Sequence, residues 1–384
     1  QIPDAVAIQF PFVKYHPKKP WGWFKLAEST DYRVSLSRRS GVPIAFEPGA
    51  MDQVMRRLLD QSGCDLWCDS RFMTATHSNG LIHTLTVENE NSTREVSAGV
   101  FIDATANIQL ARQVECAASI GMDAREMYGE PSAPESPELV LNNASLCYRV
   151  AKLNDEEPAQ IQERPVGLDM QNLNPVTSIR TYPNGDLNMN PVQMMTGLEA
   201  HELGKGAYDE AQRRILAHWH LLQTEYEFDR WRLVWTSPRL GVREDYRLIG
   251  RYVLTEHDVD GGYNAGNHPD IVAISDHAID FHGARPSREL HSGPFGIPFR
   301  CLMAKEFNNL LVACRGASFS SVAASSCRLS RTMMVLGQAA GTAAGLFGTD
   351  ISHFDAERLQ QRLKQDGVSL DPSHGYLDNM RDVE

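Results

Sequence analysis

The sequence predicts an α/β protein, and two stretches carry that prediction. In residues 309–347, a short apolar run from Leu310 to Cys314 precedes a loop of small and hydroxyl residues and then a helical pattern. A run of this length and composition is typical of a buried strand. Residues 47–105 read as a helix, a hairpin and a returning strand. Strands that alternate with helices in this way are typical of α/β domains.

The first 46 residues predict an irregular segment, because prolines interrupt any helix that would form there. A helix is expected next, since apolar residues have helical spacing and Gly63 is placed to end it. Its apolar residues are Met51, Val54, Met55, Leu58 and Leu59. Residues 65–68 predict a short strand, and Asn79-Gly80 predicts the turn of a hairpin. A further strand is expected to end at VFIDAT, residues 100–105.

Residues 114–300 are interpreted as a substrate or cap domain between two parts of a core, 47–113 and 301–350. Clusters of Pro and Asn at 131–137 and 165–191 predict long loops. Residues 194–227 predict the longest helix, which we expect Gly204 and Gly206 to divide. His218 and His220 lie two residues apart, so a helix cannot present both to one ion, and no metal site is expected.

A helix is expected from Arg328 to about Phe347, and a helical tail within 351–384 is expected to end at Gly367. Within the first of these helices, glycines at 337, 341 and 345 share one face. Each costs about 1 kcal/mol relative to Ala in a helix interior. We therefore expect this face to lie against a strand or a flat ligand.

Three segments resemble the FAD-dependent oxidoreductase family. Ser326, Arg328, Thr332 and LGQAAGTAA at 336–344 match its C-terminal signature, although Arg331 stands where the family has Pro and Cys314 where it has Gly. VFIDATANIQLA at 100–111 is similar to its VFIDATGDADLA, with Ala106 and Asn107 replacing Gly and Asp. GVREDYRLIGRYVLT at 241–255 is similar to a third phrase. Together they cover roughly 47–113 and 241–347.

The resemblance implies a FAD/NAD(P)-binding fold of the glutathione-reductase type, with a mixed sheet flanked by helices and a second, substrate domain. It implies FAD as cofactor, with the helix after Arg328 pointing its N-terminus at the flavin ring. The residues expected to bind the cofactor are Arg315, Gly316, Ser326, Arg328, Arg331, Thr332, Ala106 and Asn107. Those expected to bind substrate or transfer a proton are His282, Arg243 and Arg300. A structural, hydrogen-bonded role for His282 remains the alternative.

The dinucleotide fingerprint G-x-G-x-x-G, which cradles a pyrophosphate, does not occur in the sequence. The chain thus resembles the family without its N-terminal ADP-binding βαβ unit, either as a fragment or after loss of that part. We expect this chain alone to bind FAD weakly or not at all.

The composition of the chain narrows the classes of partner that it could bind. A net charge of −12 argues against a nucleic-acid surface, and no apolar run approaches the roughly 20 residues that span a bilayer. Seven scattered cysteines argue against a disulfide framework and favour free thiols in a reducing, cytoplasmic location. The expected partner is a small-molecule substrate.

The leading hypothesis is an FAD-dependent oxidoreductase that moves a hydride or an electron pair between a small organic substrate and the flavin. A second hypothesis is a binding module without cofactor, favoured by the missing fingerprint and by Ala106 and Asn107. A third is a flavin-independent polysaccharide-active enzyme, which requires two carboxylates facing across a cleft.

Overall fold

A computed structural model describes residues 13–15, 24–26, 48–90, 92–168, 177–182, 184–283, 287–288 and 290–372. Contacts divide the chain into two compact units, each built from two separate stretches. Unit 1 is Gln1–Leu66 with Asn142–Val242, and unit 2 is Trp67–Leu141 with Arg243–Glu384. Within the described residues, no helix combines the length and the apolar character needed to cross a membrane.

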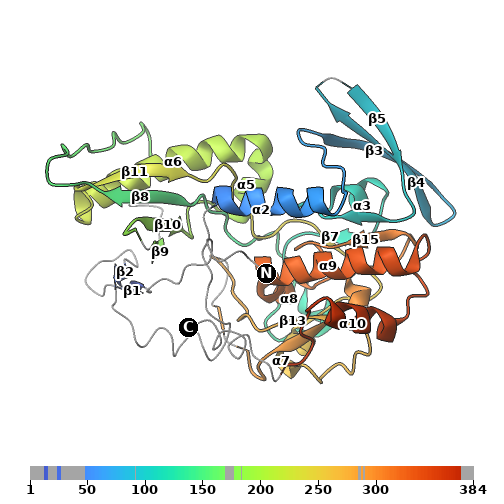
Figure 1. Ribbon diagram of the computed structural model, residues 1–384. Coiled ribbons are helices and arrows are strands. Elements are labelled where there is room, and N and C mark those ends of the chain that lie inside the picture. The colour runs from blue at the N-terminus through green and yellow to red at the C-terminus, as the bar shows by residue number, and fades with distance from the viewer. Residues whose placement is uncertain are drawn as a thin grey trace. The chain divides into compact units, whose positions relative to one another are not determined.

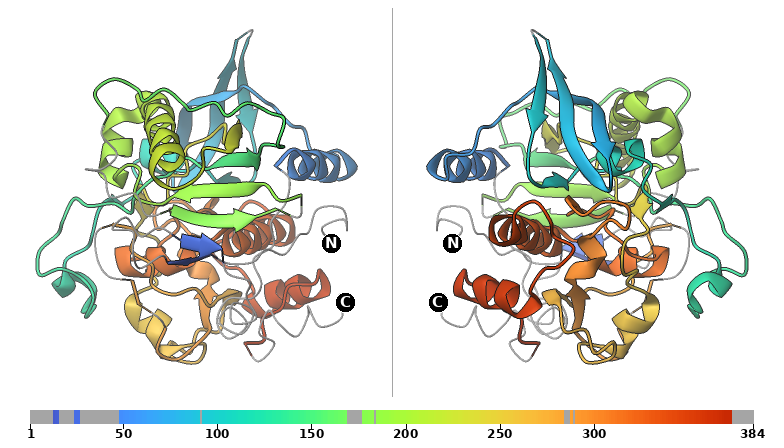
Figure 2. Two further views of the ribbon diagram at one scale, coloured as in Figure 1. Left: turned by 90° about the vertical axis from the view of Figure 1, so that its left-hand side faces the viewer. Right: turned by 90° about the vertical axis from the view of Figure 1, so that its right-hand side faces the viewer.

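Unit 1 is built on a four-stranded antiparallel sheet in the order β11-β8-β10-β9 (Figure 1). Helix α6 packs on it, because Trp219 and Leu222 of the helix share one core with Tyr148 and Met189 of the strands (Figure 2). The elements are β1 (Val13–Tyr15), β2 (Phe24–Leu26), α2 (Pro48–Gln61), β8 (Tyr148–Lys152), β9 (Thr177–Thr181), β10 (Leu187–Pro191), α5 (Gly197–Leu203), the 3-10 turn η2 (Gly204–Gly206), α6 (Ala207–Glu225) and β11 (Trp231–Thr236). The glycines at 204 and 206 divide the long helical pattern as predicted.

His218 of α6 is part of the unit 1 core. Its Nδ1 lies 2.7 Å from the Tyr148 hydroxyl and its Nε2 lies 2.9 Å from Thr177 Oγ1. Burial lowers the pKa of His218 to about 3, so the ring is neutral at any physiological pH. Both nitrogens are used by the fold, which explains a buried histidine here without a ligand.

Unit 2 contains a three-stranded antiparallel sheet, β3-β4-β5, and several two-stranded pairs. Its elements are β3 (Arg71–Ser78), β4 (Leu81–Asn89), β5 (Ser92–Ser97), β6 (Phe101–Asp103), α3 (Gln109–Gln113), β7 (Ala118–Ser119), α4 (Arg125–Tyr128), β12 (Arg247–Leu248), α7 (Glu256–Gly261), β13 (Ile271–Ser275), β14 (Phe295–Pro298), the 3-10 turn η3 (Phe299–Leu302), β15 (Leu310–Val312), α8 (Ser321–Cys327), α9 (Ser330–Phe347) and α10 (Ala356–Gln365). The hairpin turn is confirmed, since Asn79 and Gly80 both have positive φ, at 51° and 72°. The strand predicted at 65–68 is wrong, because these residues form a turn and irregular chain.

The parallel pair β15 and β6 confirms the α/β class. Leu310 pairs with Phe101 and Val312 with Asp103, so two segments about 200 residues apart run side by side. Leu310 and Val312 pack into one core while Leu311 packs into another, which holds the buried face of α9. Ligands of α/β proteins lie beyond the carboxyl ends of parallel strands. For this pair those ends lead into residues 104–107 and 313–316.

The C-terminal helical pattern forms two helices where the sequence predicted a loop and one helix. α8 begins after Ser320, whose Oγ accepts a hydrogen bond from the Ala323 N–H at 3.1 Å. Leu329 then adopts extended backbone, with ψ at 146°, and α9 begins at Ser330. The prediction of a loop at 321–327 was wrong because Ser, Ala and Cys are weak local signals. Their helix is stabilised by its cap and by complete burial.

The glycine face of α9 lies open. Gly337, Gly341 and Gly345 are exposed, and a Cβ added to any of them would meet no described atom within 4 Å. The prediction that this face lies against a strand is therefore wrong for the residues described, and its alternative, a flat ligand, stays a prediction. The face that packs is the opposite one, which includes Leu336 and Ala343.

We predict that Gly337→Ala stabilises the protein. With open space beside it, Ala should raise the free energy of unfolding by about 0.5–1 kcal/mol through helix propensity. Gly316→Ala is the contrasting variant, because its Cβ would lie 2.5 Å from Ile108 Cγ2 and 2.7 Å from the Tyr246 carbonyl oxygen. That overlap should lower the free energy by roughly 1–3 kcal/mol. Urea unfolding of both variants measures the changes. Destabilisation by Gly337→Ala would show that this face is packed.

Candidate functional site

The candidate site lies in unit 2, where a loop at residues 276–282 meets the beginning of α9. Leu329, the residue before the helix, provides no side-chain cap. The first N–H groups of a helix have no partner within the helix itself, and they lie at the positive end of the helix dipole. A developing negative charge or a carbonyl oxygen is stabilised at such a position.

Two ion pairs join the loop to the helix junction. Arg328 donates to Asp280 Oδ2 at 2.9 Å, and Arg331 donates to Asp276. Ser326 of α8 adds a hydrogen bond from its hydroxyl to the His277 carbonyl oxygen. The Arg328 side chain is only 10% exposed, so its pair is largely shielded from water. These contacts fix the loop against the α8–α9 junction.

His282 is held in the same loop by the carboxylate of Asp280, with Nε2 at 2.7 Å from Oδ2. Burial lowers the pKa of His282, and the charges of Arg243 and Arg328 lower it further, although Asp280 acts in the opposite direction. The neutral imidazole is thereby favoured near pH 7 and can accept a proton. The predicted residues His282, Arg243 and Arg328 thus influence one another electrostatically.

Two buried guanidinium groups near this loop have unused donors. The Nε–H groups of Arg315 and Arg328 are buried and meet no acceptor among the described residues. Burial lowers the pKa of both side chains, yet a guanidinium remains charged in a protein. An uncompensated buried donor costs about 1–3 kcal/mol, so an acceptor from a ligand would be stabilised here. Gly316 follows Arg315 and leaves no room for a side chain.

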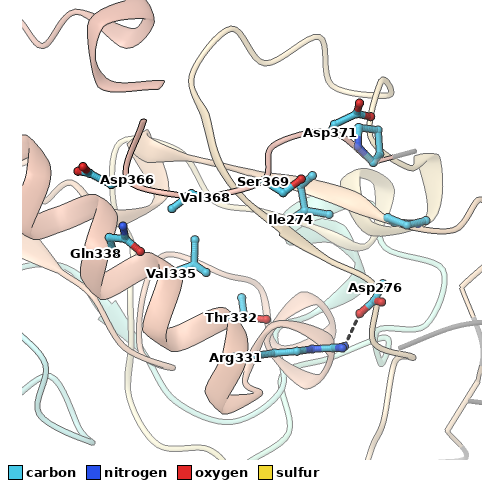
Figure 3. A pocket seen from close by; sticks show the side chains of 13 residues that line it. Ile274, Asp276, Arg331, Thr332, Val335, Gln338, Asp366, Val368, Ser369 and Asp371 are labelled. Atoms are coloured by element: carbon cyan, nitrogen blue, oxygen red, sulfur yellow. Dashed lines mark hydrogen bonds and ion pairs between the residues drawn. The ribbon is translucent and has the colours of Figure 1, made fainter. Parts of the chain in front are cut away.

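A pocket of about 250 Å³ opens beside the Arg331–Asp276 pair (Figure 3). Thr332 lines it, is 2% exposed, and has a hydroxyl without a partner among the described residues. Apolar walls come from Ile274, Val335 and Val368. The remaining lining residues are Pro294, Gln338, Asp366, Gly367, Ser369, Asp371 and Pro372. The pocket therefore offers a donor and an acceptor side by side, a free hydroxyl and apolar walls.

Three other predicted residues lie outside these contacts. Arg300 bonds the Asp270 carboxylate at 3.0 Å through Nε and lies over the Tyr252 ring, in a different network of unit 2. Ala106 is exposed and Asn107 is half-buried in the turn after β6. Among the described residues, none of the three makes a hydrogen bond or ion pair with the 276–282 loop.

Sequence reasoning missed Asp276 and Asp280, the acidic partners of the two arginines. They precede α9 by about 50 residues, so no helical or strand periodicity relates them to it. The one local signal was the spacing of Asp280 and His282, two residues apart, which allows a carboxylate and an imidazole in one loop to meet.

Comparison with known proteins supplies the family. A family model described as "FAD dependent oxidoreductase" matches residues 22–363, so the chain belongs to the FAD-dependent oxidoreductase family. FAD is the cofactor of this family. The fold class and family expected from the sequence motifs are confirmed. No curated protein matched the chain.

Among solved structures, the chain is similar to a myxobacterial chondrochloren halogenase, described as a variant of FAD-dependent halogenases. The identity is 11% and the TM-score 0.38, over 94% of this chain and 64% of that one. A geranylgeranyl bacteriochlorophyll reductase-like protein from Thermoplasma acidophilum matches at 10% identity and TM-score 0.37, over 99% and 83%. A further flavin-dependent halogenase matches at 9% and 0.41, over 94% and 50%. The chain thus spans less than two thirds of the first of these proteins and half of the third.

The residues present fit the ring end of FAD. The pyrimidine part of a flavin carries carbonyl acceptors and an N–H donor on one edge. Arg331 and Asp276 offer a donor and an acceptor side by side, and Thr332 adds an unused hydroxyl. A volume of about 250 Å³ is below the usual 300–1,000 Å³ of pockets for whole drug-sized ligands, so it suits a ring system better than an entire dinucleotide.

A separate buried carboxyl group, Glu130, supports the beginning of α8. Its Oε1 accepts from the Glu256 N–H at 2.7 Å and from the Ser320 hydroxyl, while its Oε2 meets no donor among the described residues. Burial raises the pKa of Glu130 to about 7, and the nearby carboxylates Asp123 and Glu256 add to the rise. The folded protein therefore binds a proton here more tightly than the unfolded chain does.

Stability is predicted to fall as pH rises from about 4.5 to 7, because only the folded state keeps Glu130 protonated in that range. The loss amounts to at most about 3 kcal/mol, from 1.36 kcal/mol per pH unit. Glu130→Gln places an amide oxygen where the carboxyl oxygen accepts its hydrogen bonds and removes the titratable group. The variant should therefore flatten the dependence of stability on pH. Chemical unfolding between pH 5 and 8 is the measurement, with Glu126→Gln, an exposed carboxyl on α4, as control. An unchanged slope in Glu130→Gln would contradict the assignment.

Proposed function

We propose that this chain provides the flavin-ring and substrate sites of an FAD-dependent oxidoreductase acting on a small organic substrate. The bound cofactor would accept or donate a hydride or an electron pair. The observation that carries the proposal is the pocket at the start of α9, where Thr332 has a buried hydroxyl without a partner beside the Arg331–Asp276 pair.

Protein groups around the pocket have distinct roles in this proposal. Arg331, Thr332 and the α9 N-terminus hold the pyrimidine edge of the ring. Arg328 and the first turn of α9 stabilise negative charge that develops there, since preorganised donors are most effective where water is excluded. Arg315, Gly316, Ser326, Ala106 and Asn107 form the surrounding backbone and polar wall of the cofactor site.

His282 accepts or donates the proton that accompanies the redox step, and Arg243 binds an acceptor group of the substrate beside it. The lowered pKa of His282 supports the first role, because a neutral ring near pH 7 is a competent base. The electrostatic influence of Arg243 on His282 supports the role of Arg243 in substrate binding, since it indicates that the two side chains lie near each other.

The alternative of a binding module without cofactor is supported by Ala106 and Asn107, which replace the family Gly and Asp, and by the absence of the fingerprint from the sequence. The missing fingerprint affects the pyrophosphate end of the cofactor site, and the changes at 106 and 107 affect a turn that the resemblance places close to the cofactor. These changes leave the polar groups of the pocket in place. Binding of the flavin ring to the chain therefore distinguishes the oxidoreductase from the module without cofactor.

Flavin titration with Thr332→Val tests the proposal. Since the Thr332 hydroxyl has no partner within the described protein, Val should leave the fold intact while it removes a bond to the ring. We expect the fluorescence of riboflavin to be quenched when it binds the wild-type chain. Thr332→Val should weaken this binding by about tenfold, equivalent to about 1.4 kcal/mol. FAD should bind little more tightly than riboflavin, since no fingerprint for its pyrophosphate occurs in the sequence.

Thr342→Val, on the same helix and half-buried, is the matched control and should bind as the wild type does. Absence of riboflavin binding at any concentration would favour the module without cofactor. Tight FAD binding that is insensitive to Thr332→Val would show that the cofactor is held elsewhere.

A further inference from the structure

Asp280 receives an unusual number of donors for a single carboxylate in this loop. His282 Nε2 lies 2.7 Å and Arg328 Nη2 2.9 Å from Oδ2, and the Ser287 hydroxyl lies 2.9 Å from Oδ1. A second imidazole, His277, is 3.7 Å away, too far for a hydrogen bond. Although burial opposes ionisation, the two histidines and Arg328 hold the pKa of Asp280 well below its usual range. The carboxylate is therefore negatively charged at every working pH.

A permanently ionised carboxylate fixes the tautomer of its imidazole partner. An ionised Asp can only accept hydrogen bonds, so the proton in the bond to His282 resides on Nε2. The neutral form of this tautomer carries its lone pair on Nδ1. In hydrolase triads a buried Asp holds a catalytic imidazole in one tautomer by the same physical means.

We infer that Asp280 is a positioning residue that holds His282 in the Nε2–H tautomer. The role of His282 in proton transfer rests on the proposed function, whereas the tautomer follows from this structure alone. Arg328 has a second part in the arrangement, because its bond to the same carboxylate oxygen prevents Asp280 from turning away.

The charge of Asp280 also balances the ring when it takes up a proton. Among the groups that act on His282 are the anion Asp280 and the cations Arg243 and Arg328, and burial opposes the imidazolium as well. Of these, Asp280 favours the imidazolium. Without it, the two arginines and burial would lower the pKa of His282 further.

Histidine NMR on the full chain, with ¹⁵N-labelled rings, reads the tautomer and the titration of His282 directly. The signal is assigned by its loss in His282→Gln. In the wild-type protein we expect Nδ1 unprotonated and Nε2 protonated at pH 8. If the neutral His282 ring of the wild-type protein is protonated on Nδ1, or exchanges between the two tautomers, the inference is wrong. This result needs no variant of Asp280.

Asp280→Asn removes the charge and keeps the shape. The pKa of His282 should fall by roughly 1–3 pH units, the usual effect of one neighbouring charge, and the tautomer should no longer be uniform. Asp280→Glu should restore the Nε2–H form, and Asp276→Asn, the same change in the same loop, should leave His282 unaffected. If Asp280→Asn leaves both the tautomer and the titration unchanged, the inference is wrong. Flavin binding by the same variants is read separately, so failure of the proposed function is distinguishable.

Discussion

Two ion pairs, Arg328 with Asp280 and Arg331 with Asp276, hold the 276–282 loop against the beginning of α9. Each pair joins a loop after β13 to the α8–α9 junction, about 50 residues later in the chain. Removal of one partner from a buried ion pair leaves an uncompensated charge, which typically costs 3–5 kcal/mol. The pairs are 10–24% exposed, so a smaller cost applies here. The pocket, the His282 site and the uncapped helix end all depend on this attachment.

The same attachment explains how one short loop serves two chemical purposes. On one side, Asp276 and Arg331 place an acceptor and a donor beside the Thr332 hydroxyl in the pocket. On the other, Asp280 organises His282 and Arg328. The loop thus separates a surface suited to a ring with polar edges from a group suited to proton transfer. In the proposed oxidoreductase, both are needed within reach of the same reacting centre, as proximity requires.

Local pattern predicted the elements but not what surrounds them. Spacing of apolar residues and glycines predicted α9 and the Asn79-Gly80 hairpin, because both depend on nearby residues. It did not predict α8, whose helix depends on the Ser320 cap and on burial. Periodicity showed that Gly337, Gly341 and Gly345 share a face, but exposure of that face is a tertiary property. In the site, motif residues such as Arg328 and Thr332 were found, whereas their acidic partners were missed. Arg300 was expected to bind substrate or transfer a proton; its bond to Asp270 was not predicted, because charge alone does not specify a partner.

The claim that the α9 N-terminus faces the reducible ring is tested most directly by the flavin midpoint potential. The measurement compares wild-type protein at saturating flavin with Arg328→Leu and with Arg300→Leu, which removes a cation of unit 2 outside the site. In the proposed function Arg328 stabilises the reduced, negatively charged ring, so its loss should lower the potential by about 30 mV or more, equivalent to about 1.4 kcal/mol for two electrons. Arg300→Leu should leave the potential unchanged. A potential that stays constant in Arg328→Leu while the melting temperature falls would show that Arg328 only supports the fold, and would contradict the account.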